Sequence, residues 1–199
     1  VEGMADQRGG NTQFGALLLL APLVRAASRG NLSPAGASEV VEATTVEDAV
    51  SFYRAFEHVD VAVEDPPEGL DDLDVRRGAA AVPALEARGT TLWDVMDVSD
   101  RDANAAEWTG GFERVFAAGE AMLVDEGPAP DRVARAFLRL LATGEDTLVR
   151  VDHDADVAAE VRERAREVGT DLDAAESLAE EFVERGINPG TTADLTAAA

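Results

Sequence analysis

The chain has 199 residues, of which 46% are apolar, so it is long enough to bury one substantial hydrophobic core. A total of 40 Asp and Glu residues stand against 17 basic residues, all of them arginine, and the formal net charge is −23. Such a charge repels nucleic acids and anionic membranes, which excludes both as partners. The absence of cysteine excludes disulfides, thiolate zinc sites and cysteine nucleophiles. We expect a cytoplasmic protein from a salt-accumulating organism, whose acidic residues mostly keep the surface hydrated.

The first expected element is a helix that follows Asn11 and runs to about Ser28, where Gly30 is placed to act as its C-terminal cap. It contains the apolar run over residues 14–24. This run is too short to cross a bilayer, which takes about 20 residues, and Pro22 interrupts it. We therefore expect a helix of the core rather than a membrane segment.

The next elements are a turn, a helix and a loop. Pro34 and Gly36 predict a turn. Thr45 followed by Asp48 has the spacing of a capping box, which predicts a helix start. Residues 59–74 are rich in Pro, Gly and acidic side chains, so we expect an exposed crossover there. The alternating "VDVAV" within it resembles a strand, but a lone strand would have no partner.

Helical spacing of apolar residues returns after this loop. The stretch "RRGAAAVPALEARG" predicts a short helix that contains Pro83 or ends near it, and residues 89–91 separate it from "LWDVMDV". Further helices are expected over residues 111–124, 130–143, 157–168 and 172–185, each followed by a glycine within a few residues. The pattern predicts an all-α, single-domain bundle over residues 1–199. We also expect an N-terminal helical portion and the end of the last helix to be missing from it.

Three of the expected helix starts have the same local chemistry. In "RGGNTQFGALLLL" two glycines allow a tight turn and Asn11 or Thr12 can cap the helix. In "GEDTLVR" Asp146 and Thr147 follow a glycine at once. In "GINPGTTADL" the residue Asn188 caps, Pro189 takes the first helical position and Gly190 lets a ligand approach the backbone. Free N–H groups at a helix start bind anions such as phosphates, although each motif alone is more typical of an ordinary cap.

The order and separation of these motifs resemble the triphosphoribosyl-dephospho-coenzyme A synthase family. "AAAVPAL" resembles a weaker segment of the same family, so the likeness covers most of the chain. Two places depart from the family pattern: Phe14 stands where many bacterial members have lysine, and "DHD" follows Arg150 and Val151 where a glycine is common. The residues that match the family are Asn11, Thr12, Gly15, Asp146, Thr147, Asn188, Pro189, Gly190, Ala193 and Asp194.

The resemblance implies an all-helical enzyme that uses ATP and 3′-dephospho-coenzyme A, or a related coenzyme acceptor, as substrates. A hydroxyl of the acceptor attacks the ribose C1 of ATP, adenine leaves and a triphosphoribosyl group is transferred. The chemistry calls for a base, a carboxylate near the sugar and Mg²⁺ with N–H donors for the triphosphate. On this resemblance Asp146 and Asp194 are the candidates for the catalytic base and for Mg²⁺ binding.

The resemblance also implies a set of residues that bind the substrate. Asn11, Thr12, Thr147, Asn188 and Gly190 would hold phosphate or ribose oxygens, and Arg150 would neutralise phosphate charge.

Two interpretations from other classes stay open. The first is a metal-dependent nucleotide phosphohydrolase, because His153-Asp154 is the dyad of such enzymes and "EVRE" at residues 160–163 resembles half of an all-α pyrophosphohydrolase motif. The second is a non-enzymatic acidic helical interaction module, in which the three motifs are only caps and lie far apart. Trp93 and Trp108 are expected in the core, with stacking on adenine as their alternative role.

Overall fold

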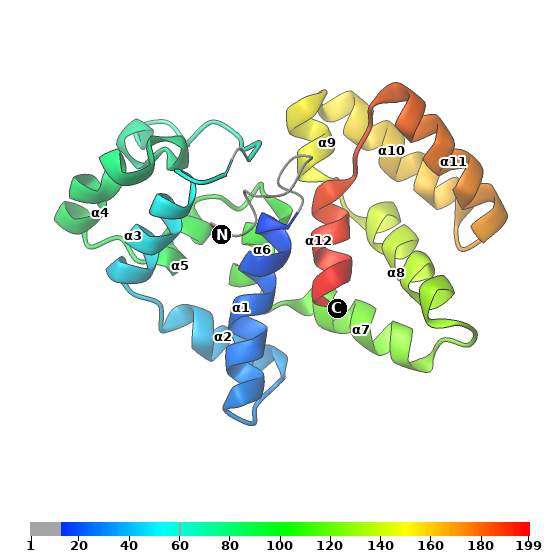
Figure 1. The fold of residues 1–199 in the computed structure, drawn as a ribbon, viewed down its shortest axis with the longest axis horizontal. Helices are drawn as coiled ribbons and strands as arrows, with labels where there is room; N and C mark the ends of the chain where they lie inside the picture. Colours follow the sequence, from blue (N-terminus) through cyan, green and yellow to red (C-terminus); the bar gives the residue numbers. More distant parts are fainter. Residues whose placement is uncertain (1–12, 60) are drawn as a thin grey trace. The chain divides into compact units, whose positions relative to one another are not determined.

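The computed structural model of the chain describes residues 13–59 and 61–199. These residues form twelve α-helices, and no strand occurs among them, so the predicted all-α fold class is confirmed. Their contacts divide the molecule into two compact units, the first ending at Phe112 and the second spanning Glu113–Ala199 (Figure 1). The single domain over residues 1–199 stays a prediction, and each unit is described by itself.

The first unit contains six α-helices and two 3₁₀ segments among its described residues. They are α1 (Phe14–Ser28), α2 (Pro34–Glu42), α3 (Val46–Ala55), η2 (Asp71–Leu73), η3 (Val75–Ala81), α4 (Val82–Arg88), α5 (Leu92–Asp97) and α6 (Ala103–Thr109).

The predicted turn at Pro34 is wrong, because α2 begins there. The Ser33 side chain caps this helix by accepting a hydrogen bond from the Gly36 N–H, and Pro34 lacks the N–H that the first turn would leave unpaired. A side chain would not fit at position 36, because a Cβ on Gly36 would lie 2.0 Å from the Asn31 carbonyl oxygen. The capping box expected at Thr45 and Asp48 is confirmed at the start of α3.

Helix α1 packs against α2 and α6. Its buried residues include Leu19 and Leu23, which are 0% and 6% exposed. Trp108 of α6 is also buried, and its indole N–H donates to the Leu18 carbonyl at 3.2 Å. The expected core position of Trp108 is confirmed, whereas Trp93 is half-buried.

The second unit contains the other six helices. They are α7 (Glu113–Val124), α8 (Ala129–Thr143), α9 (Thr147–Asp152), α10 (Ala155–Val168), α11 (Leu172–Arg185) and α12 (Gly190–Ala198).

The core of the second unit lies where α8, α9, α10 and α11 meet. Helix α10 packs against the other three, and its small or branched residues Ala158, Val161 and Ala165 are fully buried. Phe182 of α11 and Leu141 of α8 belong to the same cluster. The apolar stripes at three- and four-residue spacing predicted these contacts, because such a stripe covers one face of a helix.

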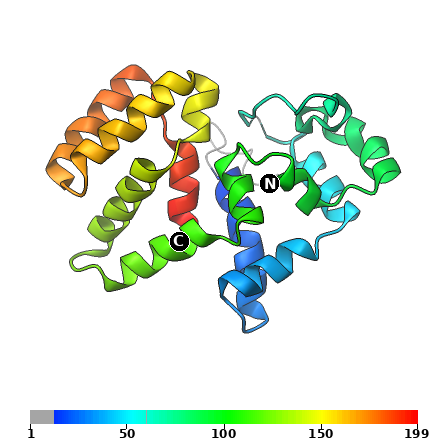
Figure 2. The same cartoon turned by 180° about the vertical axis from the view of Figure 1, so that it is seen from behind.

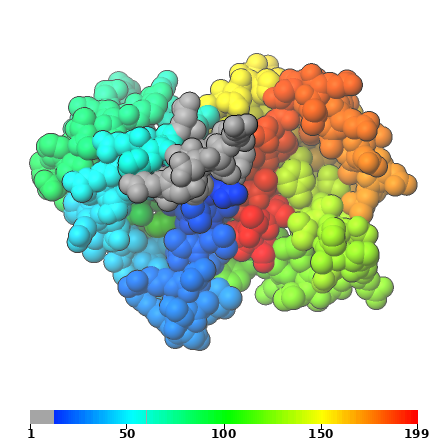
Figure 3. Space-filling model, in the orientation of Figure 1, coloured from blue at the N-terminus to red at the C-terminus, as the bar shows by residue number. Residues whose placement is uncertain are grey.

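Helix α12 lies beside α7, α8 and α9, and Figures 1 and 2 show it, in red, from opposite sides. Its end approaches α7 so closely that a Cβ on Gly119 would lie 2.7 Å from the Ala199 carbonyl oxygen. Part of α12 reaches the surface in Figure 3, in agreement with an exposed Ala193 and a half-buried Asp194. This packing brings the start of α12 to the start of α9.

None of the helices in the described ranges has the length and apolar content needed to cross a membrane.

Candidate active site

The second and third motifs meet in the second unit, where the N-termini of α9 and α12 cap each other. Asp146 is the N-cap of α9, and its Oδ1 accepts the Val149 N–H at 3.1 Å. Its Oδ2 accepts the Thr192 N–H of α12 at 2.7 Å. In return, Thr191 Oγ1 accepts the Leu148 N–H of α9 at 3.1 Å. We call this arrangement of Asp146, Thr191 and the three N–H donors the α9–α12 junction.

The junction is buried. Asp146 is 1% exposed, and Thr191 and Thr192 are 6% and 3% exposed. A carboxylate in this position is stabilised by the partial positive charges of two helix N-termini at once. The N–H groups of Leu148, Val149 and Thr192 are therefore satisfied by oxygens of the protein itself and are not the donors that would hold a phosphate.

The start of α12 differs from the expected cap. The helix begins at Gly190 with Pro189 as its N-cap, so the predicted cap at Asn188 and helical position for Pro189 are wrong by one residue. Asn188 is exposed, and its backbone carbonyl accepts the Gly190 N–H at 2.8 Å. A Cβ on Gly190 would lie 2.6 Å from Leu148 Cδ2, so a side chain there would have to displace the end of the Leu148 side chain.

The remaining predicted residues of this unit lie on α9 and α12, the two helices that form the junction. Thr147 is buried at the first position of α9, and Arg150 is half-buried in its last turn. Asp194 is half-buried in α12, two residues after Thr192. The structure thus brings the starts of the second and third motifs together, and the chemical roles of these residues stay predictions.

The first motif belongs to the other unit. Asn11 and Thr12 lie outside the described residues, and α1 begins just after them at Phe14. The convergence of all three motifs on one site stays a prediction.

The donor set of Asp146 does not fit a direct Mg²⁺ ligand. Both of its oxygens already accept backbone N–H groups, and its side chain is fully enclosed. Over residues 13–59 and 61–199, no group of three or more His, Cys, Asp or Glu side chains is placed to hold a metal ion. Mg²⁺ is commonly held by one or two carboxylates together with substrate phosphates, so the half-buried Asp194 is the better candidate of the two.

The residues that suggested a phosphohydrolase have structural tasks. Asp154 caps α10 by accepting the Val157 N–H at 2.8 Å, and His153 Nε2 lies 3.3 Å from the Gly186 carbonyl oxygen. Glu160, the first residue of "EVRE", forms an ion pair with Arg185 of α11.

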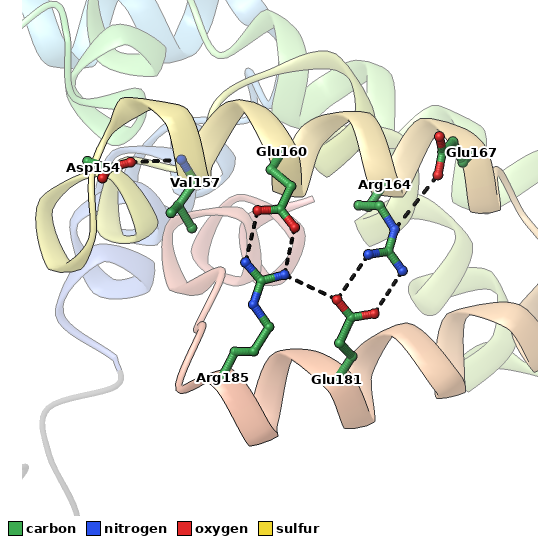
Figure 4. A network of polar contacts seen from close by, with 7 residues as sticks. All are labelled: Asp154, Val157, Glu160, Arg164, Glu167, Glu181 and Arg185. Atoms are coloured by element: carbon green, nitrogen blue, oxygen red, sulfur yellow. Dashed lines mark hydrogen bonds and ion pairs between the residues drawn. The ribbon is translucent and has the colours of Figure 1, made fainter.

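This pair belongs to a network of ion pairs between α10 and α11, shown in Figure 4. Arg185 Nη1 lies 2.6 Å from Glu160 and 3.1 Å from Glu181, and Arg164 donates two hydrogen bonds to Glu181 at 2.9 and 2.8 Å. Hydrogen bonding from Arg185 lowers the pKa of Glu160, and hydrogen bonding from Arg164 lowers the pKa of Glu181. The network joins two helices at the surface and shows no feature of a metal site.

Sequence reasoning missed two sets of buried polar residues. Thr191 and Thr192 lie in the third motif, but only the fold shows that they bond to α9. Asn104 and Glu107 of α6 are 7% and 3% exposed, and no motif singled them out. A Glu in a short stretch that contains three alanines and Trp108 was the one available signal.

Comparisons with known proteins agree with the motif pattern. The family model for ATP:dephospho-CoA triphosphoribosyl transferase matches residues 1–199. A crystal structure from Archaeoglobus fulgidus, provisionally described as a triphosphoribosyl-dephospho-CoA synthase, is similar with 26% identity and a TM-score of 0.75, covering 94% of this chain and 79% of that one. No curated protein matches the chain. Because the family model spans all of its residues, the chain belongs to the ATP:dephospho-CoA triphosphoribosyl transferase family.

Proposed function

We propose that the reaction of this family, transfer of the triphosphoribosyl group of ATP to dephospho-CoA, is carried out in this chain by residues of the three motifs. The observation that supports this assignment is the α9–α12 junction, in which Asp146 binds both the second and the third motif. Two separate caps would need no such bridge. The family match favours neither the phosphohydrolase nor the interaction module.

The burial of each carboxylate suggests a division of tasks. Asp146, enclosed and doubly hydrogen-bonded, positions the starts of α9 and α12. Asp194 is half-buried in α12 and so less enclosed than Asp146, and it would bind the Mg²⁺ that accompanies ATP. Arg150 would neutralise phosphate charge from α9.

The polar groups around the junction would bind the substrate oxygens. Thr147, Asn188 and Gly190 would act in the second unit, and Asn11 and Thr12 would do so from the first motif. The cytoplasmic location and the adaptation to salt, both expected from the acidic composition, belong to the same proposal.

The reaction places three demands on these groups. The C1′–N bond of ATP breaks and adenine leaves with the bonding electrons, so positive charge develops on the ribose. The attacking hydroxyl must lose its proton to a base. The triphosphate, which stays on the transferred sugar, needs cations and polar donors throughout.

The test is chromatography with mass detection of the full chain in molar KCl with Mg²⁺, ATP and 3′-dephospho-CoA. We expect free adenine and a triphosphoribosyl adduct in equal amounts. Phosphate or pyrophosphate would instead support a hydrolase, and untouched ATP would contradict the proposal for this acceptor.

The role of Asp194 is tested in the same assay by Asp194→Asn. We expect the rate to fall at least about tenfold and to recover in part at higher Mg²⁺, because the amide is the weaker Mg²⁺ ligand. Asp156→Asn, an exposed position on α10, is the matched control and should keep the full rate. An Asp194→Asn protein with the wild-type rate and Mg²⁺ dependence would remove Asp194 from the site.

A further inference from the structure

Helix α9 is bonded to the third motif at both of its ends. At its start, Asp146 accepts the Thr192 N–H of α12 at 2.7 Å. At its end, the imidazole of His153 lies against the first residue of the third motif, with Nε2 3.3 Å from the Gly186 carbonyl oxygen. Figures 1 and 2 show the connection between α11 and α12 beside α9. The proposed function uses the contact at the start of α9 and leaves the contact of His153 without a task.

The part of the connection that His153 contacts is a tight turn. Helix α11 ends in a Schellman motif, in which the N–H groups of Gly186 and Ile187 donate to the Val183 and Phe182 carbonyls at 3.1 and 2.8 Å. These bonds use carbonyls of the helix and not the carbonyl of Gly186 itself. His153 supplies the hydrogen-bond partner for that carbonyl.

A second tight turn follows directly. Pro189, with φ −74° and ψ 62°, is the centre of an inverse γ-turn, which the Gly190 N–H closes by donating to the Asn188 carbonyl at 2.8 Å. Asn188 is exposed, and a Cβ on Gly190 would lie 3.6 Å from its Nδ2, so the carboxamide lies beside the first residue of α12. We call residues 186–190 the third-motif loop. The backbone of this loop sets the direction of the Asn188 carboxamide.

The chemistry of the contact suits a histidine. A carbonyl oxygen only accepts hydrogen bonds, so Nε2 of His153 carries a proton and donates it to Gly186. The neutral tautomer with Nε2–H and the imidazolium ion both provide this donor. The last carbonyls of a helix carry partial negative charge, and histidine is favoured beside them. Asp154 takes no part in the contact, because its side chain caps α10.

We propose that His153 is a positioning residue for the third-motif loop, an inference that rests on the proposed function. Its imidazole holds the Gly186 carbonyl, and the loop beyond Gly186 presents the Asn188 carboxamide to the phosphate and ribose oxygens of ATP. The far end of the loop is fixed to α9 by the bond between Asp146 and Thr192. His153 fixes the near end to the same helix, so α9 holds the loop at both ends.

The first test compares His153→Ala, which removes the donor, with His153→Gln, whose side-chain amide keeps an N–H donor. In the assay for adenine and adduct we expect the alanine variant to raise KM for ATP about 2- to 10-fold, the range that one hydrogen bond supports, with kcat little changed. The glutamine variant should recover most of the wild-type KM. His58→Ala, the same replacement at the other histidine of the chain, is the matched control and should keep the wild-type KM.

Hydrogen exchange separates the loop from the rest of the fold without a measurement of activity. Mass spectrometry of the wild type and His153→Ala should show faster exchange over residues 186–192 in the variant, with the helices of the first unit unchanged. His153 is exposed, so the variant is expected to stay folded. A role in folding alone would lower the unfolding midpoint and the active fraction but would leave KM of the folded protein unchanged.

A double-mutant cycle with Asn188→Ala tests whether His153 acts through Asn188. The two replacements should not add, because a loop without the carboxamide gains nothing from being positioned. A His153→Ala protein with the wild-type KM would overturn the proposal, whether or not its exchange is faster, and so would fully additive effects in the cycle. If the wild type forms no adenine or adduct, the proposed function fails and the positioning role fails with it, while the exchange data show separately whether His153 holds the loop.

Discussion

At the scale of single residues, Tyr53 gives a direct test of the core of the first unit. It is the one tyrosine in the chain and is 1% exposed, and its hydroxyl donates to the Leu73 carbonyl. Burial, with added repulsion from Asp74 and Asp72, raises its pKa from 10.0 to about 12. The neutral phenol is the form that fits the folded state, so its contribution to stability is complete below pH 10 and is lost as the pH rises through about 12.

The measurement is a titration of phenolate absorbance, with circular dichroism on the same samples to define the pH range of folded protein. We expect a titration midpoint near pH 12 in buffer and near pH 10 in denaturant. The two tryptophans do not titrate in this range, so the absorbance change reports on Tyr53 alone. A folded protein that titrates near pH 10 would show that Tyr53 is exposed to solvent.

Asp146 shows how far a single residue could be predicted from the sequence. Its predicted position at the start of a helix is confirmed, because the "GEDT" pattern carries the local signal. Its second contact joins residues 46 positions apart in the chain, and no local pattern encodes such a contact. The enclosure of its carboxylate therefore follows from the packing of α12 against α9.

At the scale of elements, the ion pairs between α10 and α11 predict a small pH-dependent contribution to stability. Replacing Arg185 with Gln removes its contacts with Glu160 and Glu181. Both glutamates have pKa values lowered from 4.5, so the pairs stabilise the folded state above pH 4.5 and lose this effect as the pH falls through the lower, folded-state values. The side chains are 36% to 42% exposed, so we expect only a modest drop in the unfolding midpoint.

The measurement is urea unfolding of wild type and Arg185→Gln at neutral pH and well below pH 4.5. The difference between them should be present at neutral pH and vanish in acid, and it should also shrink in molar salt because exposed charges are screened. Arg54→Gln, at an exposed position in the last turn of α3, is the charge-matched control. A difference that persists in acid would mean that Arg185 acts through packing instead.

The elements that the sequence predicts well have strong periodicity and clear ends. Helices α8, α10 and α11 have apolar stripes and are each followed by a glycine, and the structure places them close to the expected ranges. Proline and glycine dominate the start of α2 and predict a turn there, although proline is also favoured at the first helical position. The sequence pattern predicts no helix at α6, since seven residues are too few for a periodic pattern, and Glu107 is missed with it.

At the scale of the whole molecule, the formal charge of −23 dominates the response to salt. Repulsion among 40 carboxylates favours expansion of the chain, whereas the exposed ion pairs of the described residues each contribute little. Salt screens both the repulsion and the ion-pair attraction, because the Debye length falls from about 10 Å at 0.1 M to about 3 Å at 1 M. Because the long-range repulsion is stronger than the ion-pair attraction, its loss decides the direction in which stability changes.

We therefore expect the thermal unfolding midpoint to rise as KCl increases from low to molar concentration. The control is the same series near pH 4.2, the isoelectric point of the sequence, where the net charge is close to zero and the rise should shrink strongly. The measurement is the thermal unfolding midpoint, followed by circular dichroism at each KCl concentration. A midpoint that falls with salt at neutral pH would mean that the ion pairs outweigh the repulsion, and a rise of equal size at both pH values would assign the effect to apolar burial instead of charge.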